Sequence, residues 1–206
     1  DWSSDVCSSD LFFPDPALER AIRKELGIVS GDITRKDVLD RTELDLSGAG
    51  KSEEDKIRDL TGLSCFTNLE TLDLSSNEIT DIQEFQWMRM LKKLHLESNQ
   101  IRDLSPLSGL SDLHRLDLFN NQITDISPIT GLTKVTMLDV RKNNIQDIQG
   151  IGGMRSINEL YLGRNQITDI SPVAELQNLH SLGFGYNNVE DISALNALPL
   201  LHVLTM

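Results

Sequence analysis

Six asparagines recur at intervals of 22 residues, and this repeat restricts the fold more than any other feature of the 206-residue chain. They are Asn77, Asn99, Asn121, Asn143, Asn165 and Asn187. Apolar columns keep the same step on both sides of each asparagine, as Leu94, Leu96 and Ile101 do around Asn99. A fixed period with this apolar pattern indicates a solenoid with one coil per repeat, because a single coil cannot bury its leucines alone.

The spacing within one repeat predicts the path of a coil. The Leu-x-Leu step is a short strand with alternate residues pointing inward, and successive coils stack these strands into a parallel sheet. The asparagine follows the strand, where its amide can bond backbone groups of its own and adjacent coils, so we expect a buried asparagine ladder. A coil of 22 residues leaves no room for a three-turn helix, and Ser-Pro pairs at Pro106, Pro128 and Pro172 disfavour one. The return path should therefore consist of 3₁₀ turns and extended segments.

A second polar column consists of aspartates. Its members are Asp59, Asp81, Asp103, Asp125, Asp147, Asp169 and Asp191. Stacked carboxylates suggest calcium, but that ion needs six or more converging oxygens. Each aspartate precedes a turn in which its side chain can accept local N–H groups, so we interpret the column as structural capping.

The chain divides into three regions. Residues 1–11 resemble a translated sequencing adapter, and we expect them to be a non-native segment. Residues 12–41 do not repeat and should form a helical N-terminal cap, with Asp15-Pro16 starting one helix and a Thr34…Asp37 capping box starting another. Residues 42–206 hold about seven and a half coils, and we expect the C-terminus to be truncated within the repeat.

The cap and the repeats together resemble a known family. The segments FPDPALERAIRKELG, DIT and LDLSG, followed by tandem NQITDISP-type units, are similar to internalin-like bacterial leucine-rich repeat proteins over residues 12–206. The resemblance implies an α/β solenoid, a leucine-rich repeat horseshoe with a parallel concave sheet, a 3₁₀ or extended convex side and a short helical N-terminal cap. It also implies a module that binds a protein partner on its concave face within a secreted or cell-surface protein, although no signal peptide is present in the sequence.

The residues between the consensus leucines should point out of the concave sheet, where a partner would bind. Phe119 and Tyr161 should be exposed aromatics beside Arg115, Arg141 and Arg164, and this combination is favoured in binding hot spots. The predicted partner-binding residues are His95, Arg115, Phe119, Arg141, Tyr161, Arg164 and Tyr186. Nearby glycines should leave a shallow depression; they are Gly163, Gly183 and Gly185.

Composition and motifs exclude several other functions. With 32 acidic against 19 basic residues and a net charge of −13, the chain lacks the basic face of a nucleic-acid binder. It has no apolar run of 18 residues for membrane insertion, and two cysteines cannot form a four-cysteine zinc site.

Catalysis and metal binding are not expected from the motifs either. Asp117, Asp139 and His95 fall on adjacent strands, but an open sheet with no pocket or nucleophile argues against an enzyme. His180 and His202 share a column without an evident third ligand. We therefore predict no enzyme activity, no metal and no cofactor.

Two alternative functions stay open. The repeats can be a targeting or spacer domain of a larger enzyme, or an intracellular leucine-rich scaffold of the phosphatase-regulator type. Whatever its function, we expect a monomer, with edge association possible through the truncated C-terminal coil because its strand is unpaired on one side.

Overall fold

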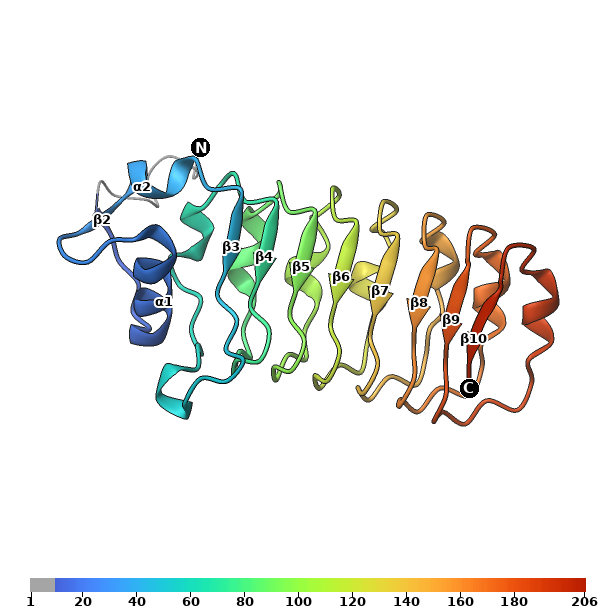
Figure 1. Cartoon of the computed structure of the whole chain (residues 1–206). Helices are drawn as coiled ribbons and strands as arrows, with labels where there is room; N and C mark the ends of the chain where they lie inside the picture. The colour runs from blue at the N-terminus through green and yellow to red at the C-terminus, as the bar shows by residue number, and fades with distance from the viewer. Residues whose placement is uncertain (1–9) are drawn as a thin grey trace.

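The computed structural model describes residues 10–206, which form a single-layered curved sheet backed by short helical turns (Figure 1). Eight strands run parallel and pair in chain order, as the repeat predicts. Consecutive consensus leucines lie directly opposite one another, for example Leu72 beside Leu94 and Leu94 beside Leu116. The strands are β3 (Glu43–Asp45), β4 (Thr71–Asp73), β5 (Lys93–His95), β6 (Arg115–Asp117), β7 (Met137–Asp139), β8 (Glu159–Tyr161), β9 (Ser181–Gly183) and β10 (Val203–Thr205).

The convex side consists of 3₁₀ turns and extended segments, which confirms the prediction. Three of the turns begin at a Ser-Pro pair, where proline supplies the φ angle of a first helical position. The turns are η1 (Glu53–Asp55), η2 (Leu63–Cys65), η3 (Gln83–Trp87), η4 (Ser105–Leu107), η5 (Ser127–Ile129), η6 (Ile151–Gly153), η7 (Ser171–Glu175) and η8 (Ser193–Ala197).

A small helical cap covers the first coil at the N-terminal end (Figure 1). It contains β1 (Asp10–Leu11), α1 (Pro16–Leu26), β2 (Ile33–Thr34) and α2 (Arg35–Leu39), with β1 and β2 antiparallel. Asp15 accepts the N–H groups of Ala17 and Leu18 at 2.7 and 3.1 Å, and α1 ends at Gly27 with φ 70°. Thr34 and Asp37 form the expected capping box. The adapter-like segment lies outside the described residues except for Asp10 and Leu11.

One continuous apolar core runs through the cap and all the coils, and the asparagines follow its edge. Asn99 is typical: its Oδ1 accepts the N–H of Ile79 at 3.0 Å, and its Nδ2 donates to Leu96 O and Leu74 O. Each asparagine thus satisfies groups in two coils. Asn187 makes the same bonds but is only half-buried, because only β10 follows its coil.

The aspartate column caps turns. Each of its seven carboxylates accepts the N–H of the residue two positions later, as Asp125 does from Ser127 at 2.8 Å. The carboxylates therefore serve the local turns. Cys65 is buried and is not a free thiol.

Candidate functional site

The outward residues of the concave face differ in exposure, although the repeat places them equivalently. Asp139 is 1% exposed and Met137 is 7% exposed, whereas Arg115 and Arg141 are exposed. Phe119 and Tyr161, expected to be exposed, are half-buried because their neighbours cover them. Side-chain contacts between coils therefore determine which residues are available to a partner.

Arg141 organises one patch of this face. Its guanidinium lies over the ring of Phe119 at 5.3 Å and over the ring of Tyr161 at 5.1 Å. It also pairs with Asp139, whose carboxylate oxygens lie 2.9 Å from Nε. The hydrogen bonds that Arg141 donates to Asp139 raise the pKa of Arg141, and the guanidinium supplies the counter-charge of this buried carboxylate.

Arg164 and Tyr186 continue this patch. The Arg164 guanidinium lies 4.4 Å from the centre of the Tyr186 ring, which is 76% exposed. Both residues have left-handed backbones, with φ 58° and 60°, as does every residue that precedes a ladder asparagine. We call Phe119, Arg141, Tyr161, Arg164 and Tyr186 the stacked patch. Stacking of arginine on aromatic rings holds these long side chains in place.

The stacked patch borders an open groove of about 230 Å³. Gly163, Gly183 and Gly185 form part of its lining, so the predicted depression is present. A Cβ atom on Gly183 would lie 3.4 Å from the Tyr161 ring, so the missing side chain keeps the ring face open. The groove offers apolar surface with two arginines beside it.

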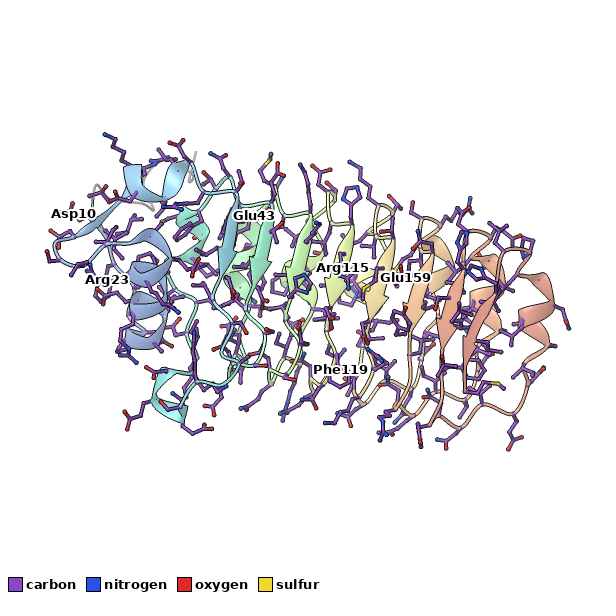
Figure 2. All side chains as sticks on the ribbon, viewed as in Figure 1. Asp10, Arg23, Glu43, Arg115, Phe119 and Glu159 are labelled. Carbon is purple, nitrogen blue, oxygen red and sulfur yellow. The ribbon has the colours of Figure 1, made fainter. Side chains whose placement is uncertain are left out.

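Arg115 and His95 do not belong to the stacked patch. Figure 2 shows Arg115 at the level of β6, whereas Phe119 lies lower, past the end of that strand. His95 instead faces carboxylates: its Nδ1 lies 4.0 Å from Glu97 Oε2, and donor atoms of His95, Glu97 and Asp117 all lie within 4.8 Å of one another. We call Asp73, His95, Glu97 and Asp117 the carboxylate–histidine patch.

The charges of the carboxylate–histidine patch are poorly compensated. Burial, together with the charges of Asp117, Asp73 and Asp139, raises the pKa of Glu97 to about 7. Burial and the charge of Asp139 also raise the pKa of Asp117, despite a hydrogen bond from the N–H of Phe119. Glu97 Oε2 is buried and has no hydrogen-bond partner among the described residues.

Comparison with known proteins settles the family. Leucine-rich repeat models match residues 56–101, 89–131 and 133–175. An internalin (inlF) from Listeria monocytogenes is 34% identical with a TM-score of 0.88, and the match covers 93% of this chain and 56% of that one. The chain is an internalin-like leucine-rich repeat protein.

Two further solved structures are similar to this chain. An internalin C2 from Listeria monocytogenes is 30% identical with a TM-score of 0.72, covering 94% of this chain and 93% of that one. A Leptospira interrogans leucine-rich repeat protein, 22% identical with a TM-score of 0.66 over 84% of this chain and 50% of that one, shares the fold. No curated protein matches the chain. This internalin-like chain spans little more than half the length of the inlF protein.

Sequence reasoning missed Glu97 as a site residue. The signal was present, because Glu97 lies two positions after His95 and alternate strand residues share a face. His180 and His202 do lie together, with ring centres 5.6 Å apart, and the Nδ1 of each ring donates to a backbone carbonyl two residues earlier. That contact involves no carboxylate, unlike the contact at His95.

Proposed function

We propose that this chain is a non-catalytic protein-recognition module that binds a protein partner on the concave face, within a secreted or cell-surface protein. The observation that carries the proposal is the stacked patch, where Arg141 is held between two aromatic rings beside the groove. Aromatic and arginine side chains dominate binding energy at protein interfaces, particularly when they are already ordered. The internalin relatives support the same class of function.

The stacked patch suits recognition because its side chains are already ordered in the free chain, so less conformational entropy is lost on binding. Arg141 contacts Phe119, Tyr161 and Asp139 within the free chain, so binding would not have to fix this side chain. The glycine-lined groove can receive a side chain of the partner next to the tyrosine rings. Within residues 10–206, no helix has the length and apolar character that a membrane crossing requires.

The test begins with a displayed library of protein ectodomains, from which binders of the purified chain are selected. Affinity for each selected partner is then measured by biolayer interferometry for the chain and for the Phe119→Ala/Tyr161→Ala double variant. We expect the double variant to weaken binding at least about tenfold, because truncating hot-spot aromatics costs roughly 2 kcal/mol or more.

A matched control on another exposed surface is Arg102→Ala/Gln122→Ala. These side chains also contact each other between adjacent coils, at 2.7 Å, so the variant removes a comparable inter-coil pair. The control should bind with unchanged affinity. Loss of binding in the control but not in the concave variant would overturn the proposed site, and unchanged binding in both would favour a spacer role.

A further inference from the structure

We propose that His95, Glu97 and Asp117 form a binding site for a divalent transition-metal ion, with Zn²⁺ as the ion that fits best. The sequence predicted no metal for this chain, and the site does not depend on the proposed protein-recognition function. Its donors are one imidazole and two carboxylates, all within 4.8 Å of one another.

The backbone holds these three donors on a rigid surface. His95 ends β5 and lies directly opposite Asp117, which ends β6. Glu97 follows His95 on the same face, and between them Leu96 is fully buried in the core and bonds to Asp117 O through its N–H at 2.9 Å. Two adjacent strands of a stacked sheet therefore fix the positions of all three donors.

The donors lie too far apart for hydrogen bonds and close enough to approach a single ion. His95 Nδ1 and Glu97 Oε2 are 4.0 Å apart, which is too long for a hydrogen bond. In a tetrahedral site, a Zn–N bond of about 2.1 Å and a Zn–O bond of about 2.0 Å place the two ligand atoms about 3.3 Å apart, somewhat closer than they lie here. Only small side-chain movements are needed for both atoms to coordinate one ion.

Charge also favours a cation at this position. Glu97 Oε2 is buried without a hydrogen-bond partner in the described part of the chain, although the Glu97 side chain as a whole is 30% exposed. Within residues 10–206, neither Glu97 nor Asp117 forms an ion pair with lysine or arginine. A bound cation would supply the counter-charge that Arg141 supplies to Asp139 in the next coil.

The donor set distinguishes among cations. Imidazole with carboxylates suits zinc and neighbouring transition ions, whereas calcium needs six or more oxygens, which three side chains including a histidine do not provide. Three protein ligands leave a coordination position open on the concave surface. Water or a side chain from outside the chain would occupy it.

Isothermal titration of Zn²⁺ into the full chain, freed of affinity tags and treated with chelator, tests the site. We expect one ion per chain with micromolar or tighter affinity. Co²⁺ bound in its place should give visible absorption bands that Zn²⁺ displaces. Glu97→Gln, Asp117→Asn and His95→Ala should each weaken binding at least about tenfold, because each removes one of only three ligands.

The matched control is His180→Ala/His202→Ala, which removes the other pair of neighbouring imidazoles. It should bind Zn²⁺ as the unchanged chain does. Thermal melting of each metal-free variant shows whether it is folded before titration. Absence of binding below millimolar Zn²⁺, or binding that is lost in the control and kept in Glu97→Gln, would overturn the proposal.

Discussion

The two halves of the concave face use the same backbone but treat buried charge in opposite ways. In the stacked patch, Asp139 is almost fully buried and is neutralised by Arg141, which is itself held between two aromatic rings. In the carboxylate–histidine patch, which begins earlier in the chain, Glu97 occupies the position equivalent to Phe119, and among residues 10–206 its Oε2 has no hydrogen-bond partner and no lysine or arginine beside it. A leucine-rich sheet therefore fixes where outward side chains begin, whereas their neighbours decide whether each position is stable alone or needs a ligand.

Removal of Arg141 should have the largest effect, because it leaves a buried carboxylate without its counter-charge. Arg141→Ala should lower the free energy of unfolding by about 2–3 kcal/mol, measured by urea denaturation. Adding Asp139→Asn to that variant should recover part of the loss. An unchanged midpoint for Arg141→Ala would show that the two patches do not differ in this way.

The asparagine ladder runs through the coils that carry both patches. Substitutions in it therefore test whether each coil contributes equally to stability. Asn121→Ala should cost about 2 kcal/mol, because it leaves the buried N–H of Ile101 without its partner and opens a polar gap in the core. The carbonyls of Leu96 and Leu118 each lose one of two amide donors and keep the other, from Asn99 and Asn143. Asn187→Ala should cost less, because water reaches this half-buried site. Equal losses in urea denaturation would contradict this gradient.

Asp15 in the cap is a third case of a buried carboxylate, and it is compensated by four backbone N–H donors instead of a cation. Burial alone would raise its pKa, but N–H groups of Arg58, Asp59, Leu18 and Ala17 outweigh burial and lower it below 3.8. The ionised form is thus favoured by folding, so its contribution is present above pH 3.8 and is lost as the pH falls through the lower folded-state pKa.

The measurement for Asp15 is thermal melting between pH 7 and pH 2. Asp15→Asn should be less stable than the unchanged chain by about 1 kcal/mol at pH 7. The difference should shrink at the acidic end of the range. A difference that stays constant down to pH 2 would mean that the carboxylate charge is not what stabilises the cap.

Glu97→Gln should have the smallest effect and the opposite sign. It removes a partly buried charge that lies near Asp73 and Asp117, so the metal-free chain should gain about 0.5–1 kcal/mol in thermal or urea unfolding. Asp139→Asn alone should destabilise the chain, since it leaves Arg141 without its partner. If both substitutions change stability in the same direction, the contrast between the patches is wrong.

The sequence determined the scaffold because each repeat carries the same structural residues at the same positions. The 22-residue period fixes the parallel strands, the inward leucines, the ladder asparagines and the aspartate-capped turns, and each is a local or nearest-neighbour contact. Arg164 and Tyr186 could also have been paired from sequence, because they share one column on adjacent coils. Prediction of the fold was therefore complete in its main features.

Only the tertiary structure decided how the outward residues combine. Arg141 could have extended toward solvent, but it stacks on rings from the coils on both sides and pairs with Asp139 two positions earlier. His95 turned toward Glu97 and Asp117, and Arg115 stayed apart from the stacked patch. Long side chains have several rotamers, so the period fixes only where they begin, and contacts across coils fix where their charged ends lie.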